Sequence, residues 1–284
     1  MKELQDIIQK HINEIEGTAA IYVKDTETNE VITINSQERF HAASTIKIPI
    51  LWEALRQVEK GSIKLDDKIL LKDVDKVGGC GVLFLLHNGL QLTLEDLLHL
   101  MIDISDNTAT NMVIDFIGKD NVNKALEELG MVDTFLARKL MVVIPGVYSY
   151  TCAKDIGRIL EAFITHEGLH KEYAEKGLAI LEAQQLNNRL SQELHLCGQC
   201  EFRVGHDNTC PQCGASIADV DSKPLHFPHK TGEIIGVTHD AGIMHIKSKR
   251  IIVVALTKGL KNNKIGYNLL SDIGLEIYDY FNNR

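Results

Sequence analysis

Long apolar runs and an excess of basic residues are both missing from this sequence. No window approaches the 18 continuous apolar residues of a membrane-spanning helix, so no span is predicted. The formal net charge of −9 argues against nucleic acid as a partner, because phosphate binding requires a basic face. Residues 1–6 lead into an amphipathic helix rather than an apolar run, so no signal peptide is predicted. We therefore expect a cytoplasmic protein, or an extracellular one if a leader has been removed.

The composition is otherwise typical of a soluble globular protein. Hydrophobic residues make up 44% of the 284 positions and charged residues 24%. A chain of this length can form one large domain or two small ones with an ample core.

Hydrophobic periodicity predicts strands near both ends of the chain and helices between them. An N-terminal helix is expected from Leu4 to about Ile15, where Gly17 ends it. Residues 65–118 are expected to be mostly helical, with a capping box at Thr93 and Asp96. The predicted fold is α+β (an α/β sandwich), with one antiparallel sheet from both chain ends and an inserted helical lobe. Strands are predicted at 18–24, 31–35, 230–234, 238–247 and 250–257, and further helices at 44–59, 109–117, 121–129, 152–166 (capped by Thr151), 171–186 and 265–281.

Ser44 and Lys47 form an S-x-x-K pair at the start of a predicted helix. Residues three apart lie on one helix face, within side-chain reach of each other. A serine hydroxyl becomes a strong nucleophile when a base removes its proton, and a lysine amine can do so where burial keeps it neutral. The helix is apolar enough to be buried on most faces, which would favour a neutral Lys47. Taken alone, the pair more often indicates a helix cap and a solvated lysine, because S-x-x-K is common by chance.

Two later segments give this pair a chemical context. Ser105-Asp106-Asn107 lies 61 residues after Ser44, and Lys230-Thr231-Gly232 opens a β-rich segment. The motifs S-x-x-K, S-D-N and K-T-G occur in this order in class A β-lactamases and penicillin-binding proteins. The sequence therefore resembles the class A β-lactamase-like serine hydrolases. The resemblance extends to a G-x-G-x-L loop at 79–83, a helix start at 92–98 and the whole of 105–111.

The resemblance implies a β-lactamase/transpeptidase-like fold with its cleft between the sheet and the helical lobe. In this family's chemistry, Ser44 attacks a strained or activated carbonyl and Lys47 accepts its proton. Ser105 relays a proton to the leaving nitrogen, while Lys230 lowers the cost of charge around it. No cofactor is required for these steps. The implied substrate-binding groups are the Asn107 side chain for an amide, Thr231 and Gly232 for a carboxylate, and the backbone N–H groups of Ser44 and Glu233 as an oxyanion hole.

Four cysteines form a pattern that this family does not have. The spacing is Cys197-x2-Cys200, nine residues, then Cys210-x2-Cys213. Two such knuckles can direct four thiolates to one metal, so we expect structural Zn²⁺ in an inserted zinc ribbon at 194–221. The hydrolase domain would then comprise 1–193 and 222–284, with the ribbon overhanging or flanking the cleft. Two disulfides, a chance pattern and a rubredoxin-like iron site are the alternatives.

The remaining cysteines and two histidines carry weaker predictions. Cys80 is expected to be an incidental small residue at the cleft rim, and Cys152 to be packed. His229 and His239 lie where substrate-edge contacts are plausible, although strand histidines are as often structural.

The segment from Thr134 to Lys154 contains no acidic residue. In class A β-lactamases a glutamate in this loop activates the water that releases the acyl-enzyme. The favoured hypothesis is a serine acyl-enzyme hydrolase acting on β-lactam or related amide or ester carbonyls, with slow deacylation. A penicillin-binding or peptidase-like acyltransferase is the second hypothesis. A weakly catalytic scaffold that presents the zinc ribbon to a protein partner is the third.

Overall fold

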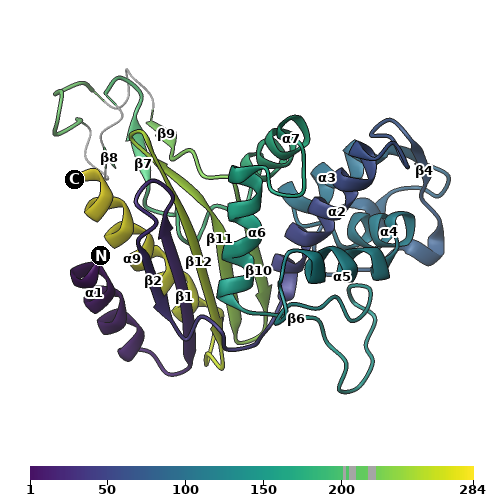
Figure 1. Ribbon diagram of the computed structural model, residues 1–284, viewed down its shortest axis with the longest axis horizontal. Helices are drawn as coiled ribbons and strands as arrows, with labels where there is room; N and C mark the ends of the chain where they lie inside the picture. Colours follow the sequence, from purple (N-terminus) through teal and green to yellow (C-terminus); the bar gives the residue numbers. More distant parts are fainter. Residues whose placement is uncertain (201–202, 205–208, 217–221) are drawn as a thin grey trace.

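A five-stranded antiparallel sheet, built from both ends of the chain, lies at the centre of the computed structural model (Figure 1). The structure describes residues 1–284 except 201–202, 205–208 and 217–221. The strand order is β10-β11-β12-β1-β2, so the N-terminal strand pairs with the C-terminal one and Val23 lies opposite Val253. The predicted sheet is confirmed. Its strands are β1 (Thr18–Asp25), β2 (Val31–Ile34), β10 (His229–Ile234), β11 (Val237–Ile246) and β12 (Lys249–Lys258).

Successive side chains along each strand point to opposite faces of the sheet, so the sheet separates two hydrophobic cores. In β1, Ala19, Ile21 and Val23 pack into the core beneath α1 (Lys2–Asn13) and α9 (Asn263–Asn282). Ala20 faces the opposite core, which the sheet shares with α6 (Ala153–Thr165) and the helical lobe. Figure 1 shows the resulting layers, with the two terminal helices together on one side of the sheet and α6 on the other.

The helical lobe is organised around α2, which packs against α4, α5 and α7. Residues 48–52 of α2 are all buried, and Trp52 meets Phe163 edge to face. A 3₁₀ turn, η1, leads directly into α2, so the predicted helix at 44–59 begins with a tighter turn. The elements of this lobe are η1 (Ala43–Ile46), α2 (Lys47–Glu59), α3 (Leu94–Asp103), α4 (Asn107–Ile117), α5 (Lys119–Glu128) and α7 (Lys171–Glu182).

The expectation that residues 65–118 are mostly helical is wrong for its first half. Residues 65–93 form irregular loops around a two-stranded pair, with short 3₁₀ turns. Glycines at 79, 81 and 89 adopt positive φ, a conformation that a continuous helix excludes. The capping box of α3 is confirmed, since Thr93 and Asp96 exchange hydrogen bonds. The minor elements here are β4 (Lys68–Leu70), η2 (Asp73–Asp75), η3 (Leu83–Leu85) and β5 (Gln91–Thr93).

Two helix ends also differ from the prediction. Cys152, not Thr151, caps α6: its Sγ accepts the Asp155 backbone N–H at 3.4 Å. Thr151 instead lies in β6 (Tyr150–Thr151), which pairs with β3 (Phe40–His41). Helix α7 ends at Glu182 because the next residues turn back onto α3, where Gln185 donates its backbone N–H to a carbonyl of that helix.

The cysteine-rich segment forms a small three-stranded sheet of its own, in the order β8-β7-β9. Its two ends lie side by side, because Leu225 donates its backbone N–H to Leu194 at 3.0 Å. Arg203 lies 3.4 Å from Asp279, near the end of α9. The described part of this segment therefore packs against the end of α9, at the top left in Figure 1. None of its described residues lines the cavity that contains Ser44, contrary to the expectation that the ribbon overhangs or flanks the cleft. The strands are β7 (His195–Cys197), β8 (Arg203–Val204) and β9 (Ser222–Pro224).

Across the described residues, no helix is both long enough and apolar enough to cross a membrane.

Candidate active site

Ser44 lies in η1, at the point where strand β10 approaches the turn. Ala43, just before it, has a φ of 44°, a strained value for a residue with a Cβ. A Cβ added at Gly232 would lie 3.2 Å from the backbone nitrogens of both Ser44 and Thr45, so only glycine allows this approach comfortably. Glu233, the next residue, borders the same cavity as Ser44. The predicted oxyanion-hole residues therefore occupy one site.

Lys47 is fully buried one turn after Ser44. Its Nζ lies within hydrogen-bond distance of the Ser105 carbonyl (2.7 Å), the Ser105 hydroxyl (3.0 Å) and Asn107 Oδ1 (3.1 Å). Burial lowers the pKa of this amine from 10.5 to about 7. The three contacts hold the amine in place beside the Ser105-Asp106-Asn107 motif, and the lowered pKa makes its neutral form accessible near neutral pH.

The Ser105-Asp106-Asn107 motif is held in place by the glycine-rich loop. Ser105 has a φ of 59°, and the Asp106 carboxylate accepts backbone N–H groups from residues 82 and 83 at 2.6 and 2.8 Å. A Cβ at Gly81 would lie 2.1 Å from that carboxylate, and one at Gly79 would lie 2.7 Å from Asn107 Nδ2. The G-x-G pattern is therefore a packing requirement that positions the polar motif.

Lys230 is the second buried lysine of the site. Its Nζ donates to the Thr231 carbonyl at 3.0 Å, and both residues are at most 2% exposed. Burial first, and then the positive charge of Lys47, lower the pKa of Lys230. A protonated Lys47 therefore disfavours the cationic form of Lys230.

The two strand histidines are structural. His229 lies between Asp240 Oδ1 (2.7 Å) and Asn187 Oδ1 (2.9 Å). His239 accepts an N–H from Thr257 and meets the His41 carbonyl at 2.9 Å; burial lowers its pKa to about 4, so its ring is neutral. Both side chains are at most 2% exposed, and the protein supplies a partner at both ring nitrogens of each, which favours the structural alternative over substrate-edge contact.

Ser44 opens into a cavity of about 550 Å³, a usual size for a small-molecule site. Its floor carries Ser44, Cys80 and Asn107. One wall is the loop that precedes α6. Two asparagine side chains fix this loop by hydrogen bonds to its backbone. Asn123 bonds both the N–H and the carbonyl of Leu136, and Asn111 does the same for Leu140. The residues that this loop contributes to the cavity are Arg138, Lys139, Leu140, Met141, Val143 and Ser149.

Glu233 belongs to a charged cluster that sequence reasoning missed. Its carboxylate accepts hydrogen bonds from Arg189 and Tyr267, and from Asn263 at 3.0 Å. Arg189 is only 4% exposed and stacks over the Tyr267 ring at 5.0 Å. Burial and the hydrogen bond to Glu233 raise the pKa of Tyr267 to about 12. No local pattern marks Arg189 as a member of this cluster, because Glu233 and Tyr267 lie at least 44 residues away in the sequence.

The profile of the β-lactamase enzyme family matches residues 2–281. The chain belongs to this family. A β-lactamase structure from Sphaerobacter thermophilus is 29% identical, with a TM-score of 0.84 over 100% of this chain and 98% of that one. The structure of PBP-A, at 23% identity and a TM-score of 0.83, shares the fold.

Curated relatives match over shorter stretches. A β-lactamase of Proteus vulgaris is 32% identical over 103 residues, which is 36% of this chain and 34% of that protein. D-alanyl-D-alanine carboxypeptidase DacF of Bacillus subtilis is 25% identical over 162 residues, or 55% of this chain and 41% of that protein. The predicted family and fold, those of a class A β-lactamase-like serine hydrolase, are confirmed.

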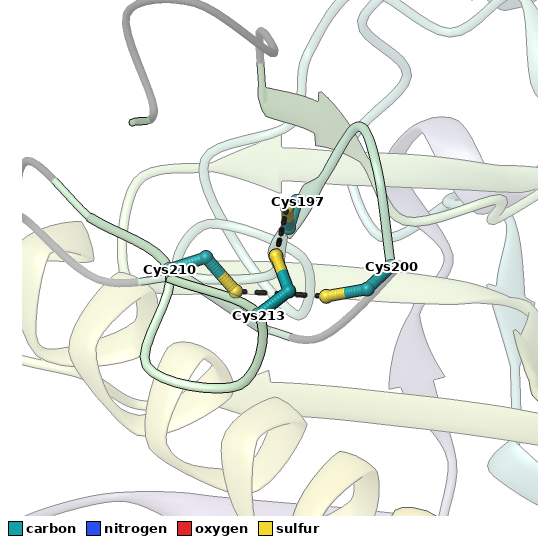
Figure 2. Close-up of side chains that lie close together, drawn as sticks. All are labelled: Cys197, Cys200, Cys210 and Cys213. Atoms are coloured by element: carbon teal, nitrogen blue, oxygen red, sulfur yellow. Dashed lines mark hydrogen bonds between the residues drawn. The ribbon is translucent and has the colours of Figure 1, made fainter. Parts of the chain in front are cut away.

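This member of the β-lactamase enzyme family also brings its four spaced cysteines together. Their sulfur atoms all lie within 4.8 Å of one another, with Cys197 and Cys213 at 3.8 Å and Cys200 and Cys210 at 3.6 Å (Figure 2). A tetrahedron with metal–sulfur bonds of about 2.3 Å places its sulfurs about 3.8 Å apart, whereas a disulfide requires about 2.05 Å. The geometry fits a four-thiolate metal site and excludes two disulfides in this conformation.

Proposed function

We propose that this protein is a serine acyl-enzyme hydrolase that acts on β-lactam or related amide or ester carbonyls and deacylates slowly. The observation that carries the proposal is Lys47, buried beside Ser44 with a pKa lowered to about 7. An amine with that pKa can accept a proton near neutral pH, as nucleophilic catalysis by a serine requires.

The proposed acylation uses the residues around the cavity floor. Ser44 attacks the carbonyl carbon, and Lys47 takes the hydroxyl proton. The carbonyl oxygen becomes negative and is stabilised by the backbone N–H groups of Ser44 and Glu233. Ser105, which contacts Lys47, passes a proton to the leaving nitrogen as the C–N bond breaks. Lys230 stabilises the negative charge that develops nearby, while Asn107, Thr231 and Gly232 bind the substrate.

Slow release is inferred from the side chains that surround the ester. The loop side of the cavity contributes basic, apolar and hydroxyl side chains, and no carboxylate among the described lining residues. Glu233 does line the cavity, but its carboxylate is tied to Arg189, Tyr267 and Asn263. Losing one general base costs ~10²–10⁴ in rate, so acylation should outrun deacylation.

The test is a burst experiment with a penicillin and a chromogenic cephalosporin. We expect about one product per enzyme, followed by a slow steady state. Intact mass should increase by one whole penicillin on the peptide that contains Ser44, and Ser44→Ala should abolish this adduct. Cys80→Ala, a change at the same cavity floor, should leave it in place. Rapid turnover without a detectable adduct would show that another group supplies the base.

Acyl transfer to an amine is the second candidate function. It is favoured by the absence of a deacylating acid in the loop and by the match to a D-alanyl-D-alanine carboxypeptidase. An added amine acceptor such as D-alanine separates the two functions. A transferase forms the aminolysis product faster than it hydrolyses the acyl-enzyme, whereas a hydrolase does not respond to the acceptor.

We also infer that the four cysteines bind one structural zinc ion within an inserted ribbon. The support is the 3.6–3.8 Å spacing of the paired sulfurs and the adjacent ends of the segment at Leu194 and Leu225. A closed four-thiolate shell leaves no open coordination position, so the metal would have a structural role and take no part in the reaction.

A further inference from the structure

A second cavity, of about 840 Å³, lies beside the cysteine-rich insertion and shares no lining residue with the Ser44 cavity. The insertion borders it through residues such as Leu196. The rest of the protein contributes the end of α9, the last residue of α7, Glu182, and two histidines, His226 and His245. Neither the proposed acylation nor the proposed zinc ribbon uses these three polar side chains.

Glu182 and His226 are close together without a hydrogen bond between them. Glu182 Oε2 lies 3.2 Å from His226 Nε2, yet this buried oxygen has no hydrogen-bond partner among the described residues. The backbone N–H of Phe227 bonds the same carboxylate group and fixes its orientation. Two ligand atoms of a tetrahedral ion with bonds of about 2.1 Å lie about 3.4 Å apart. The spacing of the two atoms therefore suits a shared metal ion.

His245 packs directly against His226. Its backbone N–H donates to the His226 carbonyl at 3.0 Å, and the two ring centroids are 3.9 Å apart. The ring nitrogens of His229 and His239 have protein partners, whereas the rings of His226 and His245 make no hydrogen bond to the described residues. The ligand atoms of Glu182 and the two histidines are not yet all within 4.8 Å of one another. A turn of the His245 ring about its side-chain bonds, toward the cavity that it lines, is needed to complete the set.

The charges around this cavity favour an exchangeable cation. Asn282 and Asn283, at the end of α9, line the cavity, and a helix C-terminus carries partial negative charge. Lys247 already donates its ammonium group to the Asn282 carbonyl. The positive charges of Lys247 and of Arg250, which pairs with His245 across the sheet, weaken the attraction for a further cation. A metal ion at this site should therefore bind reversibly.

We propose that Glu182, His226 and His245 bind one exchangeable divalent transition-metal ion beside the insertion. Two imidazole nitrogens and one carboxylate oxygen suit Zn²⁺, Ni²⁺ or Cu²⁺, whereas Mg²⁺ and Ca²⁺ prefer oxygen ligands throughout. Three protein ligands leave open positions for water, so the ion is held less firmly than one bound by four thiolates and enters when metal is added. The inference is independent of the reaction at Ser44.

The test uses full-length protein without an affinity tag, and Ni²⁺ as the probe. Calorimetric titration should show one equivalent of Ni²⁺ bound per chain, and Mg²⁺ should not compete with it. Absorption spectra should lack a thiolate-to-nickel charge-transfer band, which distinguishes this site from the four cysteines. The absence of Ni²⁺ binding, or binding that always brings up that band, would overturn the inference.

Variants locate the ion. Glu182→Gln, His226→Gln and His245→Gln should each weaken Ni²⁺ binding by at least about tenfold, since even outer-shell groups of metal sites contribute about 10–100-fold. The fold should tolerate His226→Gln best, because this side chain is 55% exposed. His99→Gln is the matched control, since His99 also contacts a carboxylate, that of Asp103 at 3.0 Å, but lies outside this cavity.

The pattern across the variants decides the outcome. Weaker binding in all three, with full affinity in His99→Gln, supports the site. Full affinity in any of the three, or equal weakening in the control, overturns the assignment. Lys247→Gln removes an opposing charge and should strengthen binding, so unchanged affinity in that variant would place the ion elsewhere.

Discussion

Lys47 is enclosed on every side and still has three hydrogen-bond partners, and together these facts determine its protonation state. Burial removes the Lys47 amine from water and thereby disfavours its protonated form. This effect lowers the pKa of Lys47 to about 7. The same partners, on Ser105 and Asn107, hold the amine in a fixed position one turn after Ser44, the serine that it deprotonates in the proposed reaction.

The first prediction is a pH profile. Below its pKa Lys47 is a cation and cannot accept a proton, so the acylation rate should rise as pH increases through about 7 and then level off. Stopped-flow measurement with a chromogenic cephalosporin from pH 5 upward gives the midpoint. Lys47→Arg, which keeps its proton at every accessible pH, should lose the reaction throughout. A midpoint near 10 would show an ordinary solvated lysine and contradict the proposed role.

The second prediction restores the missing acid. Leu140 lines the cavity, and both its backbone groups are fixed by Asn111. A carboxylate placed there would line the same cavity as Arg138 and Lys139, whose positive charges favour its ionised form. Leu140→Glu should therefore raise steady-state turnover at least about tenfold, toward the ~10²–10⁴ that a general base supplies. Leu140→Gln has the same size without basicity and should not. An equal gain in both variants would indicate loosening of the loop instead.

Among single residues, the sequence alone predicts the candidate site residues that belong to short local motifs. Ser44, Lys47, Ser105 and Lys230 could be predicted because short spacings place them together or the family resemblance assigns them. Arg189 and the two clamping asparagines could not be predicted in their roles, because they act through partners that only folding brings near.

At the scale of secondary-structure elements, prediction succeeded where one periodicity runs without interruption. The sheet strands and helices α1, α4, α5 and α9 have continuous apolar patterns, and their observed bounds lie within about two residues of those predicted. Residues 65–93 were misread because their apolar side chains, such as Leu71 and Leu83, enter the core from irregular loops whose backbone is anchored to α4 and its N-cap. Val77 bonds the Thr108 hydroxyl through its backbone N–H, and Leu83 bonds Asp106 in the same way. Hydrophobic spacing alone does not distinguish such anchors from a helix face.

The third prediction concerns the cysteine-rich insertion as an element. Its ends, Leu194 and Leu225, are buried and bonded to each other, so residues 195–224 can be replaced by Asn-Gly without separating them. The preceding segment stays in place, because Asn187 bonds His229 and Arg189 bonds Glu233, both on β10. Ser44 acylation should therefore remain within about tenfold of the full protein, or about 1.4 kcal/mol of barrier.

A full-length Cys213→Ser variant serves as the control for that deletion, because it changes the proposed metal site and keeps the insertion. Both proteins should label Ser44 at similar rates. Loss of several orders of magnitude in a deletion that still folds would show that the insertion completes the active site, through contacts that the described residues do not reveal.

At the scale of the whole molecule, the protein divides into parts of very unequal apolar content. The sheet and its helices enclose two extensive cores. The insertion has, among its described residues, a core of Cys197, Val204 and Cys210, with Cys200 packed against it. Segments of fewer than about 40 residues seldom fold without a metal, a disulfide or a partner. The stability of the insertion should therefore depend on its thiolates, and that of the catalytic body should not.

The last prediction follows from that division. Protein purified without added metal should contain about one zinc per chain, and a strong chelator should release it together with four newly reactive thiols. Hydrogen exchange should then increase within residues 195–224, while the main thermal transition and Ser44 acylation change little, because the two larger cores take only Leu196 from the insertion and the cleft takes none of its described residues. Cys213→Ser should abolish zinc binding, whereas Cys80→Ser, at an exposed cysteine outside the cluster, should not. Less than about 0.2 zinc per chain, with the four thiols paired as disulfides, would refute the metal site. Loss of the main thermal transition on chelation would show that the stability of the catalytic body depends on the insertion.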